Sequence, residues 1–145
     1  MPSQKLKLNF KVSDFNISGE PIPEDIADKI LQLHILPAQA VREDLGIPVW
    51  PSMKSGYRSA SWEKSRGRNG RSQHCFEEKG ATDYTCKNFK SNSDLLLESL
   101  IENTEYTRFA VYSTFIHADY KLTASGQREV FSSDHQSHWK FERFV

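Results

Sequence analysis

Three short segments of the chain carry side chains that suit a metal-dependent reaction. They are Ser72-Gln73-His74, Gly80-Ala81-Thr82-Asp83 and Phe115-Ile116-His117-Ala118-Asp119. Two imidazoles and one carboxylate are a common ligand set for catalytic zinc, which keeps its remaining position open for water. Zinc acidifies that water enough for it to attack an amide. The two histidines and Asp83 therefore predict a site for one zinc ion and the activity of a zinc hydrolase.

The third segment places a second carboxylate beside its histidine. The segment is apolar enough to be a strand, and alternate residues of a strand share a face, so His117 and Asp119 should point the same way. A carboxylate next to a ligating imidazole orients the ring or relays protons. Asp119 is thus predicted to serve the site in one of these roles. His34 has no such neighbour in its helical segment, and we expect it to be structural.

The elements that would position these residues begin with an arm over residues 1–22, in which apolar residues alternate before a turn-forming stretch. Helix-start signals follow at Pro23, with acidic residues that suit the positive end of a helix dipole. Pro37 is expected to break or kink this helix. A second helix should then end at Gly46, which can adopt the left-handed conformation of a carboxyl-terminal cap.

The middle of the chain is more polar. Residues 49–55 are typical of a strand, and Pro51 places that strand at an edge or a bulge. The stretch 59–71 is rich in Arg, Gly and Ser, which indicates a solvated loop with a short helix around Trp62. A basic lip that helps to hold an anionic polymer over the site is the alternative function for its arginines.

The last third combines one helix with several strands. Asn92-Ser93-Asp94 is the predicted cap of a leucine-rich helix over residues 95–101. Ser125-Gly126 is the predicted turn of a hairpin. We expect one α+β domain over residues 1–145, with helices packed on a small antiparallel sheet and with 122–145 as a carboxyl-terminal hairpin and strand. Alternation predicts the later strands within residues 109–112, 115–121, 128–132 and 138–144.

Length, charge and cysteine content indicate which classes of protein fit this chain. The 145 residues suffice for one domain with its own core. Nineteen basic and 19 acidic residues balance, so no overall attraction to nucleic acid or to an anionic membrane is expected. Cys75 and Cys86 are too few for a disulfide framework and are expected to be free thiols. The first residues lack the apolar core of a signal peptide, so synthesis in the cytoplasm is expected.

A fourth motif, Ser55-Gly56-Tyr57-Arg58-Ser59, precedes the other three in the chain. In this order, from about Pro23 to Lys121, the motifs resemble the D-alanyl-D-alanine carboxypeptidase and phage endolysin family of zinc metallopeptidases. The resemblance implies a hedgehog-like metallopeptidase fold and one zinc ion held by His74, Asp83 and His117. It also implies that Arg58 meets the carboxylate or carbonyl of the substrate peptide and that Ser72 and Gln73 line the cleft.

By the same resemblance, the substrate would be a peptide bond of bacterial peptidoglycan, in a D-Ala-containing stem peptide or a cross-bridge. A monomeric phage-type lysin that acts on the wall after release, or a cell-wall peptidase, would fit, and carboxypeptidase and endopeptidase action both stay open. Neutral charge and the lack of a basic stripe disfavour a metal-dependent nuclease.

One position departs from the family. Thr114 stands where several branches carry the Glu or Asp that acts as general base. Asp119 is the predicted replacement because it should share a face with His117. A binding module that keeps the metal but has lost catalysis, and recognises a cell-wall peptide or a protein partner, is the alternative. Other residues that stay open for the role of base are Glu77, Glu78, His135 and His138.

Overall fold

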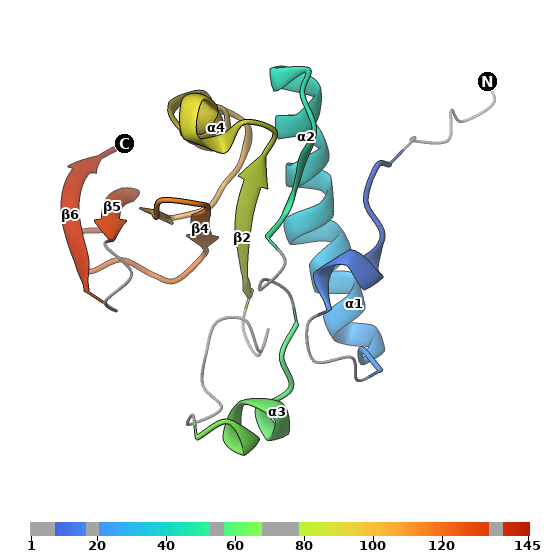
Figure 1. Cartoon of the computed structure of the whole chain (residues 1–145). Coiled ribbons are helices and arrows are strands. Elements are labelled where there is room, and N and C mark those ends of the chain that lie inside the picture. Colours follow the sequence, from blue (N-terminus) through green and yellow to red (C-terminus); the bar gives the residue numbers. More distant parts are fainter. Residues whose placement is uncertain (1–7, 17–20, 53–56, 68–78, 134–137) are drawn as a thin grey trace.

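The computed structural model describes residues 8–16, 21–52, 57–67, 79–133 and 138–145. Helices and a six-stranded mixed sheet make up this part of the chain, which confirms the α+β class (Figure 1). The elements in chain order are η1 (Val12–Phe15), α1 (Glu24–Ile30), η2 (Leu31–Ile35), α2 (Leu36–Leu45), β1 (Val49–Pro51), α3 (Ala60–Ser65), β2 (Ala81–Cys86), α4 (Phe89–Asn103), β3 (Arg108–Val111), β4 (Ile116–Asp119), β5 (Glu129–Ser133) and β6 (Trp139–Phe144).

The sequence predicted an antiparallel sheet, but the sheet is mixed. Its strand order is β1-β2-β4-β3-β5-β6, and β3 pairs with β5 in the parallel direction. The turn at Ser125-Gly126 exists, with Gly126 at a φ of 72°. It connects β4 to β5, however, and these strands lie on opposite sides of β3, so the predicted hairpin is wrong. A turn signal shows where the chain reverses but not which strands then pair.

Of the predicted break or kink at Pro37, the break is wrong, because α1, η2 and α2 follow one another without interruption. Pro37 has no backbone N–H with which to bond the carbonyl of Leu33. The hydroxyl of Tyr120 donates to that carbonyl instead, at 2.6 Å. The π-helical turn η2 lies directly before the proline, and such turns adjust the hydrogen-bonding pattern locally. Together these features let the helix pass the proline.

Helix α4 begins earlier than predicted. Its amino-terminal cap is Asn88, which has a φ of 54°, so the expected cap at residues 92–94 lies inside the helix. The Asn92 side chain donates back to the carbonyl of Lys87 at 2.9 Å. Phe89 packs against the core and extends the helix beyond the leucine-rich stretch. Asn92 therefore supports the helix start from within the first turn.

Other local predictions are confirmed. Gly46 ends α2 with a φ of 66°. Strand β1 lies at a sheet edge, where Pro51 is tolerated. The short helix α3 contains Trp62, whose backbone N–H donates to the side chain of Ser59 at 3.0 Å. Cys86 is a buried free thiol, whereas Cys75 lies outside the described residues.

The two faces of the sheet differ in composition. The core joins apolar residues of α2 and α4 to one face of β2, β3 and β4, and includes Val41, Leu100, Tyr84, Phe109 and Ile116. Because strand side chains alternate, the neighbours of these strand residues point to the other face. That second face carries Asp83, His117 and Asp119. Within the described residues, no helix is both long and apolar enough to cross a membrane.

Candidate metal centre

Asp83 and His117 meet on the second face of the sheet. Asp83 lies on β2 and His117 on β4, and the two residues are direct Cα partners in the antiparallel ladder. Direct partners project to the same side. Their side chains accordingly touch, with His117 Nδ1 at 2.9 Å from Asp83 Oδ1. Two of the three predicted zinc ligands are therefore brought together by strand register.

Asp119 contacts the opposite edge of the same imidazole. Its Oδ2 lies 2.8 Å from His117 Nε2, as expected for residues two apart on one strand. Asp119 is fully buried, and the His117 side chain is 12% exposed. The ring thus lies between two carboxylates, Asp83 at Nδ1 and Asp119 at Nε2.

The charges of these neighbours decide the protonation of the ring. Burial favours neutral imidazole, but hydrogen bonds to Asp119 and Asp83 outweigh it and raise the pKa of His117 to about 9. Burial opposes ionisation of Asp119 too, but its bonds to His117 and Arg108 hold the pKa of its carboxyl well below the usual range. In the metal-free protein at neutral pH, a pKa of about 9 makes His117 an imidazolium, which can donate from Nδ1 to Asp83 and from Nε2 to Asp119.

The sequence did not single out Arg108 or Trp139, which also belong to this cluster. Arg108 forms a two-point ion pair with Asp119. Trp139 packs on His117, with ring centroids 5.2 Å apart. Arg108 is the direct partner of Asp119 in the register of β3 and β4, so a correct pairing of these strands would have revealed it. No local signal marks Trp139, which comes from β6.

Arg58 lies in a different set of contacts. Its guanidinium pairs with the buried carboxylate of Glu63 at 3.4 Å and faces the ring of Trp62. Arg66 packs on the same ring, at 4.2 Å from its centroid. These residues belong to α3 and its flanks, beyond the amino-terminal end of β2 (Figure 1). The substrate-binding role of Arg58 stays a prediction.

The remaining predicted site residues, Ser72, Gln73 and His74, lie outside the described residues. Glu77, Glu78 and His135 do too, whereas His138 is exposed at the residue before β6. In the described ranges alone, no group of three His, Cys, Asp or Glu side chains is arranged to hold a metal ion. A metal ion at Asp83 and His117 would need a further ligand from outside the described ranges, and His74 stays the predicted one.

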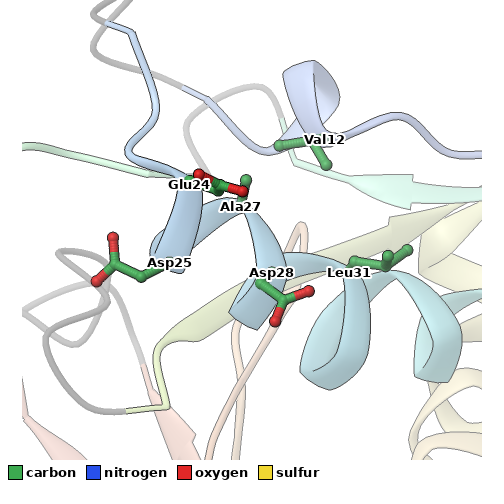
Figure 2. Close-up of a pocket in the computed structure, with 6 residues that line it drawn as sticks. All are labelled: Val12, Glu24, Asp25, Ala27, Asp28 and Leu31. Carbon is green, nitrogen blue, oxygen red and sulfur yellow. The ribbon is translucent and has the colours of Figure 1, made fainter.

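One hollow of the described surface lies away from these residues. It has a volume of about 760 Å³ and is formed by α1 with Val12 of η1. Figure 2 shows its lining residues, which include three carboxylates, Glu24, Asp25 and Asp28. None of the predicted site residues is among them, so the hollow gives no support to the hydrolase prediction.

Comparisons of the chain with protein-family models, with curated proteins and with solved structures gave no match.

Proposed function

We propose that the chain is a zinc-dependent peptidase that cleaves peptide bonds in bacterial peptidoglycan. The proposal that the protein binds zinc rests on the contact between Asp83 Oδ1 and His117 Nδ1, together with the contact of Asp119 with His117 Nε2. The substrate class rests on the four sequence motifs, from Ser55-Gly56-Tyr57-Arg58 to the His117 segment.

The donor atoms fit zinc. Tetrahedral zinc with N and O ligands at about 2.0 to 2.2 Å separates those ligands by roughly 3.3 Å. The present separation of 2.9 Å is a hydrogen bond, and a small opening converts it into a pair of ligands. His117 would bind through Nδ1 after losing that proton, while Nε2 keeps its bond to Asp119. Such carboxylate-backed histidines are typical of zinc sites.

Bound zinc supplies Lewis acidity, which lowers the pKa of water and polarises a peptide carbonyl. The chain's own groups would do the rest. Asp83 and His117 would hold the ion together with His74, and Asp119 would keep Nε2 protonated so that Nδ1 is free to bind. Arg58 would bind the substrate carboxylate or carbonyl, for which its planar guanidinium is suited.

The geometry favours an orienting role for Asp119 over that of a base. Its two oxygens already accept bonds from His117, from two nitrogens of Arg108 and from the backbone N–H of Lys121. A carboxylate so held, with a lowered pKa, is a weak proton acceptor. The base would then come from the other predicted candidates, of which Glu77 and Glu78 are closest in sequence to the ligand segment.

One observation favours the second candidate function, a zinc-binding module without catalysis. Neither Thr114 nor Asp119 supplies a free carboxylate that could act as general base. Thr114 has none, and the carboxylate of Asp119 accepts hydrogen bonds from His117 and Arg108. Such a module would still recognise a cell-wall peptide or a protein partner through the same face.

Digestion of purified peptidoglycan separates the two functions. The peptidase should release new amino groups in the presence of zinc and none after chelation, and free D-alanine would indicate carboxypeptidase action. His117→Ala should release none, while Arg143→Gln, which removes an exposed ion pair with Glu98 outside the site, should match the wild type. A zinc-loaded wild type that sediments with peptidoglycan but releases no amine would refute the peptidase and support the binding module.

A further inference from the structure

Arg108 binds both oxygens of Asp119, the carboxylate that accepts a hydrogen bond from His117 Nε2. It lies on β3 as the direct partner of Asp119. Its Nε donates to Oδ1 at 2.9 Å and its Nη2 to Oδ2 at 2.5 Å. A planar guanidinium that binds both oxygens fixes the plane of a carboxylate as well as its position.

Fixing Asp119 also fixes the imidazole. The oxygen that receives Arg108 Nη2 also accepts from His117 Nε2 at 2.8 Å. The direction of Nε2 sets the rotation of the ring, and this rotation decides whether Nδ1 points at Asp83. Arg108 therefore acts on the ligand atom through one intermediate residue.

Trp139 covers the same group from the carboxyl-terminal strand. Its ring lies 5.2 Å from that of His117 and 4.6 Å from the Arg108 guanidinium carbon. Its indole N–H donates to the Tyr112 hydroxyl at 2.8 Å, which holds the ring in place. Two strands separate β6 from β4, a span of about 14 Å in a flat sheet. The contact thus requires the β5–β6 hairpin to curl over this face.

We propose that Arg108 and Trp139 are positioning residues of the metal centre. Arg108 orients His117 Nδ1 through its bonds to Asp119, and Trp139 covers the His117 ring and the ion pair between Arg108 and Asp119. The part that concerns zinc rests on the proposed function. The carboxyl-terminal hairpin, which lies outside the segment that carries the sequence resemblance, then belongs to the centre. If Arg108 and Trp139 only fastened the hairpin to the sheet, their removal would lower stability without a specific effect on His117.

A double-mutant cycle in zinc affinity distinguishes these roles. Arg108→Gln should weaken zinc binding about 10- to 100-fold, as loss of an outer partner does in metal sites. In an Asp119→Asn background the same change should cost less than about threefold, because Arg108 then has no carboxylate to act through. An equal loss in both backgrounds would overturn the action through Asp119.

Two controls use the same hairpin. Arg143→Gln removes an exposed ion pair with Glu98, and Phe141→Leu changes a half-exposed aromatic residue of β6. Both should leave zinc affinity within about twofold, whereas Trp139→Leu should weaken it about tenfold. Each variant is first checked by circular dichroism, and Arg108→Lys and Trp139→Phe replace any variant that does not fold. Equal effects of Trp139→Leu and Phe141→Leu would remove Trp139 from the centre.

A metal-free measurement keeps this proposal separate from the proposed function. In chelator-treated protein at pH 6, the His117 Nε2–H proton should give a slowly exchanging NMR signal because Asp119 binds it. Arg108→Gln should abolish or strongly broaden this signal, while Arg143→Gln should not. An unchanged signal in Arg108→Gln would overturn the positioning role. A wild type that binds no zinc yet shows the predicted NMR effect would refute only the zinc peptidase.

Discussion

Each face of the sheet contacts a well-buried histidine whose two ring nitrogens both have hydrogen-bond partners, and the two sites have opposite character. On the helix-covered face, His34 Nε2 faces the carbonyl of Lys79, and Nδ1 faces the hydroxyls of Tyr106 and Thr82, all at 2.8 Å. On the other face, each ring nitrogen of His117 contacts a carboxylate, Nδ1 that of Asp83 and Nε2 that of Asp119. Both ring nitrogens are bonded in each histidine, and the clear difference between the two sites is the charge of the groups that face the ring.

This difference follows from elementary electrostatics. The carbonyl of Lys79 can only accept, so His34 Nε2 carries a proton, whereas Nδ1 faces hydroxyls, which can donate or accept. Burial keeps the Tyr106 hydroxyl neutral by raising its pKa well above the usual value. These three partners of His34 are therefore uncharged. Two carboxylates instead attract a cation to His117, either a proton or a metal ion.

Removal of the histidine from the face that carries the carboxylates should have the largest effect. His117→Ala should abolish zinc binding and peptidoglycan hydrolysis without unfolding the protein, because the helix-covered face stays intact. Elemental mass spectrometry after dialysis against zinc, alongside circular dichroism, checks this. His138→Ala is the control and should retain the wild-type zinc content. Full zinc content in His117→Ala would exclude His117 as a ligand.

Removal of the histidine from the core face should have the converse effect. His34→Leu leaves the buried hydroxyls of Tyr106 and Thr82 and the Lys79 carbonyl without their shared partner. A loss of about 2 to 4 kcal/mol in the free energy of unfolding is expected, measured by urea denaturation. Zinc stoichiometry of the folded variant should not change. If zinc were lost from a folded His34→Leu protein, the two faces would not be independent.

The pH dependence of stability should report the charged face. The pKa of His117 rises from 6.5 to about 9 on folding, so its contribution is fully present below pH 6.5 and is lost as the pH rises through about 9. Asp119, whose pKa is lowered, contributes above its unfolded value of 3.8 and loses this as the pH falls.

The metal-free protein should therefore be most stable between these limits, with up to about 3 kcal/mol lost toward pH 10. Thermal melts in chelator across this range test the prediction. His117→Gln should flatten the alkaline part of the profile. A wild-type profile that is equally flat would argue against a charged His117.

An ion pair outside the site should contribute least to the stability of the protein. Arg143 and Glu98 are about half exposed, unlike the buried Asp119 with its Arg108 partner. Arg143→Gln should change the free energy of unfolding by less than about 1 kcal/mol, and raised salt should shrink the difference further. A larger loss in urea denaturation would show that exposure does not separate these ion pairs.

Local signals in the sequence predicted much of this molecule. The shared face of His117 and Asp119, the cap at Gly46, the helix around Trp62 and the later strands depend on neighbours in the chain. The π-turn and the Tyr120 bond that let the helix pass Pro37 depend on residues far away in sequence. A propensity for helix termination at proline contains no information about such a distant donor.

In the candidate site, too, some features depend on sequence neighbours and others on distant residues. Asp83 was predicted from a motif, but its contact with His117 is a consequence of the pairing of β2 with β4. Arg108 and Trp139 were missed because β3 and β6 reach the centre only through tertiary structure. Sequence spacing gave Asp119 two roles, and the bonds from Arg108 favour one of them.

The most direct test of the zinc centre is a crystal structure of the zinc-loaded protein with anomalous data at the zinc edge. We predict one zinc ion within about 2.0 to 2.2 Å of His117 Nδ1 and of an Asp83 oxygen, with His117 Nε2 still bonded to Asp119. Zinc bound through His117 Nε2, at another place in the molecule, or not at all would contradict this prediction.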